Sequence, residues 1–276
     1  MKYKEFTLSP YDGNSIFACE WKPEKKAKAV VALVHGHGEY SGRYQHVADF
    51  YTNNGIAVIS FDLFGHGKSG GQRGHLPEAK AYLSSIDNLL EYASSQYPNL
   101  PIILRGHSLG GEIVLWYGME RKPKINGIIA SAPLFASYEP VPPFKLFLAK
   151  TMNSIFPAFS MKSEINTDAL SRDKSVVEKY NSDPLVHGMI STRLGWTIIE
   201  KGKWLLEHAK EFPLPLLLMV GTGEKIVNRS EIDKFAQQVP NIDYKIWDKL
   251  YHELHNEPEK ETVLKYELNW VNKHLK

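Results

Sequence analysis

The sequence contains one cysteine, Cys19, and so cannot form a disulfide within the chain. A lone cysteine fits a protein of a reducing compartment, because disulfides persist mainly in oxidising ones. Basic and acidic side chains nearly balance, with 33 Lys and Arg against 31 Asp and Glu, for a net charge of +2. So small a charge provides no field that would gather phosphate backbones, and we therefore expect no binding of nucleic acid.

The sequence also lacks any apolar run of the roughly 20 residues that a membrane-spanning helix needs. Its first residues are polar or charged and include no apolar stretch typical of a signal peptide. We therefore predict a cytoplasmic protein. With 276 residues, 43% of them hydrophobic, the chain is long enough for one large domain or one domain with an inserted subdomain.

An edge hairpin followed by alternating strands and helices predicts the fold class. Residues 2–9 and 15–21 flank Asp12 and Gly13, a pair typical of a tight hairpin turn. Apolar runs suited to strands buried on both faces of a parallel sheet then recur at 29–34, 57–61, 102–104, 127–130 and 216–220. Helical segments separate most of these runs, at 44–53, 78–97 and 109–121. The order predicts an α/β fold with a mostly parallel central sheet flanked by helices.

This alternation breaks between about Pro133 and Pro213, where helical and irregular sequence with clustered prolines replaces a short connection. We predict an inserted, mainly helical cap at 133–213, which divides the core into 1–132 and 214–276. The first half of the cap is rich in large apolar side chains, namely Phe144, Phe147, Leu148, Met152, Ile155, Phe156 and Phe159. Two interpretations stay open: these side chains anchor the cap to the sheet, or they line an apolar substrate channel.

The pattern G-x-S-x-G at 106–110 lies between an apolar strand and a helical run. A sharp turn from strand to helix holds such a serine in strained backbone geometry, and the flanking glycines permit close packing. The turn exposes the hydroxyl at the carboxyl edge of the sheet, where the helix N-terminus favours a developing oxyanion. Ser108 is therefore the predicted nucleophile of a serine hydrolase.

The base and the acid should follow the serine along the chain, in loops after later strands. His252 comes after a predicted strand at 244–247, and its imidazole can accept the serine proton and return it to the leaving group. His255, three residues further on, is the competing candidate. We favour His252 as the base.

The acid is predicted at Glu224, the only carboxylate in the loop that follows the run at 216–220. A glutamate can orient the imidazole as an aspartate does, although its extra methylene requires a small backbone adjustment. Asp248 and Asp233 are the alternatives.

The loop after the first parallel strand reads VHGHGEY at 34–40. It occupies the place where hydrolases with such a serine turn position a second oxyanion donor. The backbone N–H groups of His37 and Leu109 are the predicted donors, and loss of one such donor typically costs about 2.7–4 kcal/mol.

Together these segments resemble the monoacylglycerol lipase and lysophospholipase group of the α/β-hydrolases, from about residue 30 to the C-terminus. The matching motifs are HGHGE at 35–39, SGRY at 41–44, FDLFGHGKS at 61–69, GQRG at 71–74, GHSLGG at 106–111, YNSDPL at 180–185 and YHELHNE at 251–257. The resemblance implies an α/β-hydrolase fold, Ser108, Glu224 and His252 as a triad, and His37 and Leu109 as oxyanion donors. The chain departs from that group in three places: Glu224 stands where aspartate is usual, His37 where a small or apolar residue is usual, and Leu109 where methionine is usual.

The resemblance also implies that Glu39, Arg43, Tyr180 and His255 surround the glycerol moiety of the substrate. Structural interpretations stay open beside this one, because Arg43 can pair with Glu39 and Tyr180 can brace the cap.

The implied reaction is hydrolysis of a single-chain ester, a monoacylglycerol or a lysophospholipid, with no metal or cofactor. Short-chain carboxylesterase, acyltransferase and non-catalytic ligand-binding homologue are the alternatives. The apolar cap predicts transient contact with lipid surfaces, and we expect a monomer or weak homodimer.

Overall fold

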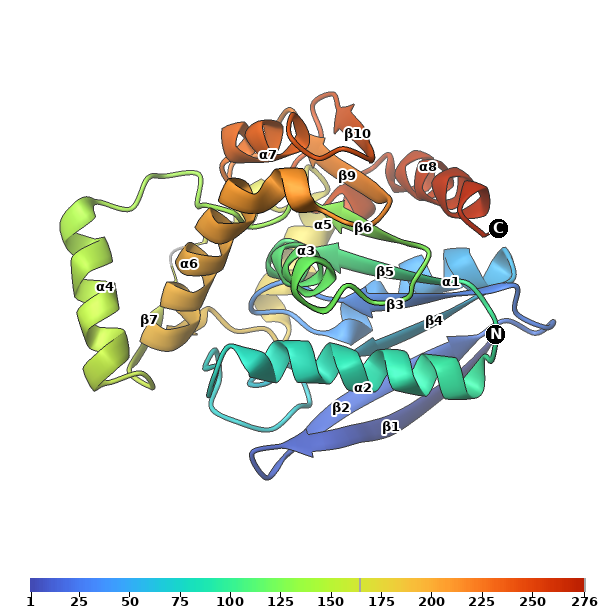
Figure 1. The fold of residues 1–276 in the computed structure, drawn as a ribbon, viewed down its shortest axis with the longest axis horizontal. Coiled ribbons are helices and arrows are strands. Elements are labelled where there is room, and N and C mark those ends of the chain that lie inside the picture. Colours follow the sequence, from blue (N-terminus) through green and yellow to red (C-terminus); the bar gives the residue numbers. More distant parts are fainter. Residues whose placement is uncertain (164, 276) are drawn as a thin grey trace.

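The computed structural model describes residues 1–163 and 165–275, and a sheet of eight strands forms its centre (Figure 1). The strands lie in the order β1-β2-β4-β3-β5-β6-β9-β10. Their bounds are Lys2–Tyr11 (β1), Asn14–Lys22 (β2), Ala29–Val34 (β3), Ile56–Phe61 (β4), Ile102–His107 (β5), Gly127–Ser131 (β6), Leu216–Gly221 (β9) and Ile242–Trp247 (β10). β2 pairs antiparallel with both β1 and β4, and the other neighbours pair in parallel.

The turn between β1 and β2 falls at the predicted dipeptide. Asp12 and Gly13 have φ angles of +50° and +72°, the left-handed conformation that a two-residue hairpin turn requires. Every residue of β3, β4, β5, β6 and β9 is buried, which is why most of their side chains, on both faces, are apolar. The predicted mostly parallel sheet is confirmed.

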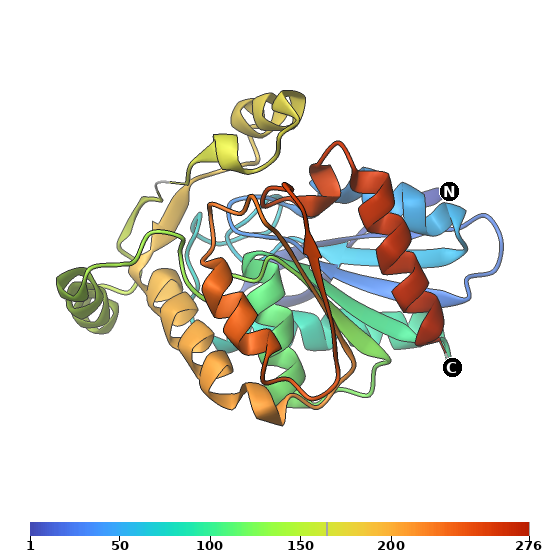
Figure 2. The same cartoon turned by 90° about the horizontal axis from the view of Figure 1, so that it is seen from above.

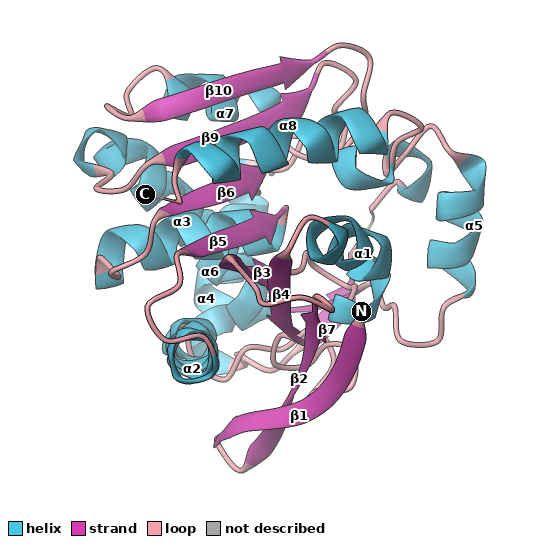
Figure 3. Cartoon of the chain, turned by 90° about the vertical axis from the view of Figure 1, so that its right-hand side faces the viewer, coloured by secondary structure: helices cyan, strands magenta, loops and turns pink. Residues whose placement is uncertain are grey.

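Helices cover both faces of the sheet, and each face has its own apolar core. One core lies between the sheet and the helices α1 (Gln45–Asn53) and α8 (Lys260–Lys273), which face the viewer in Figure 3. The larger core lies between the opposite face and α2 (Lys80–Gln96), α3 (Leu109–Arg121), α6 (Thr192–His208) and α7 (Arg229–Ala236). The predicted layers of helices flanking the sheet are therefore present.

The segment predicted as the cap carries α4, β7, α5, β8 and α6 between β6 and β9. The bounds of the elements not yet given are Pro143–Ile155 (α4), Ser160–Lys162 (β7), Lys174–Ser182 (α5) and Met189–Ser191 (β8). Leu194, Ile198 and Leu205 of α6 join the larger core, whereas α4 and α5 stand away from the sheet (Figure 2). The cap limits of 133 and 213 stay a prediction.

The apolar side chains of the first half of the cap do not anchor it to the sheet. Six of the seven are 52–74% exposed: Phe144, Phe147, Leu148, Ile155, Phe156 and Phe159. The anchoring interpretation was wrong, because helical periodicity shows that a helix has an apolar side but not which way that side points. None of the helices in the described part of the chain has the length and apolar character that crossing a membrane requires.

Candidate active site

Ser108 lies in a sharp turn between β5 and α3. Its φ of +52° and ψ of −118° are strained for a residue with a side chain. The turn packs closely on the end of β3, since a Cβ on Gly110 would lie 2.2 Å from the Val34 carbonyl oxygen. The strand, turn and helix predicted around the serine are all present, and they place its side chain in the wall of a cavity.

Glu224 and His252 form a buried hydrogen-bonded pair. His252 Nδ1 is 2.8 Å from Glu224 Oε2, and Glu224 Oε1 accepts the backbone N–H groups of Ile226 and Val227 at 2.7 and 3.1 Å. Burial raises the pKa of Glu224, but His252 and the two N–H groups outweigh burial and bring the pKa below its usual value. The carboxylate is therefore ionised and can orient the imidazole.

The other acid candidates make different contacts. Asp248 accepts a hydrogen bond from the Thr222 hydroxyl at 3.3 Å, and Asp233 accepts one from the Tyr244 hydroxyl. Of the three candidate carboxylates, Glu224 is the one that the structure brings to His252.

His252 and His255 lie in different surroundings. Burial acts to lower the pKa of His252, but Glu224 and then Glu253 raise it above its usual value. His255 is fully buried, stacks on Tyr44 with ring centroids 4.7 Å apart, and has a pKa well below its usual value because of burial and, after it, the neighbouring His107 and Arg105. Within the described residues neither ring nitrogen of His255 has a hydrogen-bond partner, whereas Nδ1 of His252 pairs with Glu224. The structure thus gives His252 the acid partner that a base needs.

The oxyanion loop, residues 35–39, packs directly on the serine. A Cβ on Gly36 would lie 3.3 Å from Ser108 Cβ. Among the residues that the structure describes, the backbone N–H groups of His37 and Leu109 donate to no protein acceptor. Both predicted donors are thus available beside the serine turn, one of them at the N-terminus of α3.

The His37 side chain is half-buried with both ring nitrogens shielded from solvent, and its ring lies 5.6 and 5.9 Å from the rings of His66 and His187. Burial, followed by the neighbouring His187 and His35, lowers the pKa of His37 to about 3. His37 is therefore neutral, and the departure at this position adds no charge to the oxyanion site.

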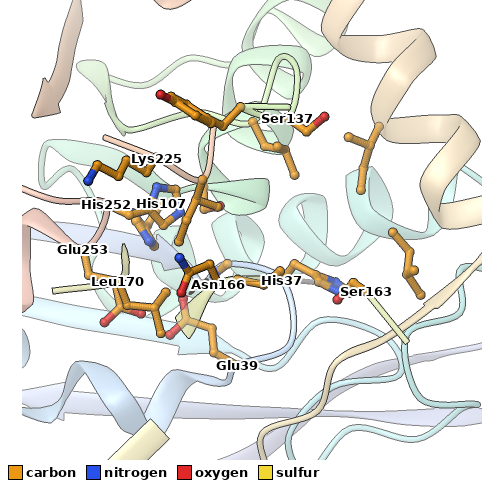
Figure 4. Close-up of a pocket in the computed structure, with 18 of the residues that line it drawn as sticks. His37, Glu39, His107, Ser137, Ser163, Asn166, Leu170, Lys225, His252 and Glu253 are labelled. Atoms are coloured by element: carbon orange, nitrogen blue, oxygen red, sulfur yellow. Dashed lines mark hydrogen bonds between the residues drawn. The ribbon is translucent and has the colours of Figure 1, made fainter. Parts of the chain in front are cut away.

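Ser108 and His252 line one cavity of about 450 Å³, within the size range of small-molecule sites. Figure 4 shows this cavity, with His252 among its labelled residues. Its wall also includes His37, Glu39 and Tyr180 from the predicted site. Its aliphatic lining residues are Leu134, Ile165, Leu170, Ile190, Ile198 and Ile226. The apolar residues of the α4 region do not line this cavity, so the channel interpretation was wrong as well.

The four predicted alcohol contacts divide into two groups. Glu39 and Tyr180 line the cavity, whereas Arg43 and His255 are not among its lining residues. Arg43 pairs with Glu39, as the structural interpretation had it, and also with Glu253. The contact with substrate stays a prediction for all four.

Glu253 and His107 are site residues that sequence reasoning missed. Glu253 lines the cavity, and the His107 ring lies 4.7 Å from the His252 ring. The signal for both was their position in the chain, since each directly adjoins a predicted catalytic residue.

A sequence model of the serine aminopeptidase S33 family (Hydrolase_4) matches residues 25–259. The chain belongs to this family. It is 33% identical, over 98% of each protein, to the monoacylglycerol lipase of Mycolicibacterium smegmatis. It is 31% identical to phospholipase YtpA of Bacillus subtilis, over 89% of the chain and 95% of that protein. The crystal structure of Paleococcus ferrophilus monoacylglycerol lipase matches with a TM-score of 0.86 at 31% identity, over 94% of the chain and 99% of that structure.

These similarities confirm the resemblance that the sequence motifs indicated, and with it the α/β-hydrolase fold. They also confirm the enzyme class, since members of the S33 family and their lipase relatives place the chain among the serine ester hydrolases.

Proposed function

We propose that the protein hydrolyses esters of a single acyl chain, and monoacylglycerols in preference to lysophospholipids, through an acyl-enzyme on Ser108. The hydrogen-bonded pair of Glu224 and His252 carries this proposal, because His252 lines the same largely apolar cavity as Ser108. The relatives named monoacylglycerol lipase and phospholipase support the substrate class.

The wall of the cavity favours a neutral alcohol. Its lining includes three carboxylates, Glu39, Glu139 and Glu253, and one ammonium group, Lys225, and Glu39 and Glu253 both pair with Arg43. Carboxylate oxygens accept hydrogen bonds from hydroxyl groups and repel a phosphate. A glycerol moiety therefore fits this wall better than a phosphorylated head group.

In the proposed reaction the Ser108 hydroxyl attacks the ester carbonyl. Nδ1 of His252 donates a hydrogen bond to the Glu224 carboxylate, so Nε2 is free to accept the serine proton and deliver it to the leaving alcohol. The N–H groups of His37 and Leu109 stabilise the oxyanion of the tetrahedral intermediate. Water then attacks the acyl-enzyme with His252 again as base, which releases the fatty acid and restores Ser108.

The test combines a fluorophosphonate probe with fatty-acid release from monoacylglycerols of increasing chain length, and Ser108→Ala is the control. We expect labelling and release in the wild-type protein and neither in the variant. The chain-length optimum then separates a lipase from a short-chain carboxylesterase.

Two outcomes would overturn the proposal. Labelling without release from any ester would point to acyl transfer, and absence of labelling would favour a non-catalytic ligand-binding homologue.

We also propose that the cap contacts lipid surfaces through the α4 face, defined as Phe144, Phe147, Leu148, Ile155, Phe156, Phe159 and Met161. Each of these side chains is at least 52% exposed, and the exposed Lys145, Lys150 and Lys162 lie in the same segment. Large exposed apolar side chains in a segment that also carries exposed lysines favour shallow insertion between lipid head groups.

Flotation with phosphatidylcholine vesicles tests this contact. The double variant Phe144→Ser and Phe147→Ser should bind vesicles less and hydrolyse a soluble p-nitrophenyl ester normally. Ile246→Ser, which changes a 37% exposed residue of β10, is the matched control and should bind as the wild type does. Equal vesicle binding by all three proteins would refute the proposal that the α4 face contacts lipid.

A cytoplasmic location and a monomeric or weakly dimeric state belong to the same proposal. The free thiol of Cys19 is buried and fits a reducing compartment. Fractionation of cells and sedimentation velocity over a concentration series test the two points.

A further inference from the structure

The carboxylate of Glu39 fastens the oxyanion loop. Its Oε1 accepts hydrogen bonds from the Gly36 backbone N–H and the Tyr44 hydroxyl, each at 2.7 Å, and its Oε2 pairs with Arg43. The Glu39 side chain is 3% exposed, so water competes little for these bonds. Since Gly36 directly precedes His37, the position of the Glu39 carboxylate determines the position of the His37 backbone N–H, the predicted oxyanion donor.

Glu253 fastens the loop that carries the base. It directly follows His252, and its two oxygens accept from Arg43 Nη1 and Nη2 at 2.7 and 2.8 Å. Glu253 Oε2 also accepts from Asn256 Nδ2 at 2.7 Å. Burial raises the pKa of Glu253, but the Arg43 guanidinium brings it below its usual value, so this side chain is an anion.

One guanidinium therefore joins the two loops, and Arg43 and Glu253 are 210 positions apart in the chain. The ring of Tyr180, from the cap helix α5, lies 4.8 Å from the guanidinium carbon of Arg43. The Arg43 side chain is only 10% exposed, and both of its terminal nitrogens donate to the carboxylates of Glu39 and Glu253. A planar guanidinium with fixed donor directions can set a distance between two carboxylates, which a single ammonium cannot do.

We propose that Arg43 is a positioning residue that sets the separation between the oxyanion donor of His37 and the base His252. Both groups must meet the same reacting carbonyl, and a misplacement of about 1 Å can cost roughly 100-fold in rate. The inference rests on the proposed function for the roles of Ser108, His252 and His37. It does not depend on which ester is the natural substrate.

The test measures kcat and KM on p-nitrophenyl butyrate, an activated ester without glycerol. Arg43→Lys keeps the charge but cannot bridge both carboxylates, so kcat should fall about 10- to 100-fold with KM nearly unchanged. Arg172→Lys is the matched control, because Arg172 pairs instead with Glu257 and Glu259. Its kcat should stay close to that of the wild type.

The pH profile separates positioning from charge. The groups that face His252 are Glu224, Glu253, Glu39 and the ring of His107. Because Glu253 raises the pKa of His252, Glu253→Gln should move the acid limb of the profile to lower pH. Arg43→Lys conserves charge and should leave that limb in place while kcat falls.

Three outcomes would overturn the inference. A loss confined to KM would make Arg43 a substrate contact, and an unchanged kcat would remove its role. A loss that matches the unfolded fraction, measured by circular dichroism, would make the role structural only. Release from p-nitrophenyl butyrate but from no monoacylglycerol would sink the proposed substrate and leave this test intact, whereas inactivity on both esters would sink both proposals.

Discussion

Glu224 and Glu112 are two buried glutamates beside the same serine turn, and their surroundings are opposite. Glu224, in the loop after β9, is 5% exposed and receives hydrogen bonds from His252 and two backbone N–H groups. Glu112, in the first turn of α3, is 2% exposed, and among the described residues neither of its carboxylate oxygens has a partner. Burial raises the pKa of Glu112 well above its usual value, against weaker opposition from the Gly202 backbone and Lys201.

The comparison shows that donors, and not burial, decide whether a buried carboxyl group is an anion that can orient a base. Glu112 lies at a cavity of about 10 Å³ between α3 and the cap helix α6. Tyr82 lines the same space, and within the described chain its hydroxyl also lacks a partner. Such a space is about the smallest that holds one water molecule. Neither Glu112 nor Tyr82 is among the residues that line the cavity of Ser108 and His252, so Glu112 takes no part in the proposed reaction.

The largest expected effect is at Glu224. Glu224→Gln keeps the shape but allows the wrong tautomer of His252, so kcat should fall by roughly 10⁴-fold with little change in KM. Steady-state kinetics on p-nitrophenyl butyrate measure this, with Glu224→Asp as the variant that retains the charge and most of the rate. A Gln variant with normal kcat would transfer the role of the acid to Asp248 or Asp233.

The second effect is on pH dependence. Because Glu224 and Glu253 raise the pKa of His252, the base becomes protonated at a higher pH than a free histidine does. The acid limb of kcat/KM should therefore have its midpoint above about 6.5, with a tenfold loss for each pH unit below it. A midpoint at or below that value would mean that burial outweighs the two carboxylates.

A smaller effect, on stability, is expected at Glu112. Glu112→Leu removes an unpartnered polar group and should raise the free energy of unfolding by about 1–3 kcal/mol. The raised pKa means that the folded state binds a proton that the unfolded state releases, so the wild-type protein loses stability as pH rises above about 4.5. The gap between variant and wild type should therefore widen with pH in urea titrations. A gap that narrows would show that Glu112 has a partner in solution.

The smallest effect is expected at His255. Like Glu112 beside Glu224, it is a buried residue of the same type as a predicted catalytic residue but lacks that residue's hydrogen-bond partners. Replacing a buried unpartnered group by an apolar one of similar shape is nearly neutral, so His255→Phe should change kcat and KM by less than about threefold. The assay compares a monoacylglycerol with p-nitrophenyl butyrate. A rise in KM for the monoacylglycerol alone would restore the predicted contact of His255 with the alcohol.

Local signals in the sequence predicted the sheet, the serine turn and the loop of the base. Each of the turns at Asp12 and Ser108 is determined by residues within a few positions of the turn itself. A buried strand is apolar whichever strands it pairs with. The pairing of Arg43 with Glu253 depends on how distant loops pack, which spacing does not encode. The outward direction of Phe147 likewise depends on how α4 is placed in the cap.

The close fit of the cap on Gly38 limits how this enzyme can be re-engineered. Gly38 has a φ of +74°, its carbonyl accepts the His187 backbone N–H at 2.9 Å, and a Cβ there would lie 2.3 Å from the His187 carbonyl oxygen. A graft that replaces residues 143–161 alone exchanges the exposed helix α4 and keeps the contact between Gly38 and His187. A graft that replaces the whole cap must bring a backbone segment that packs as closely on Gly38. The junctions of chimeras within this family should therefore lie inside the cap rather than at its borders.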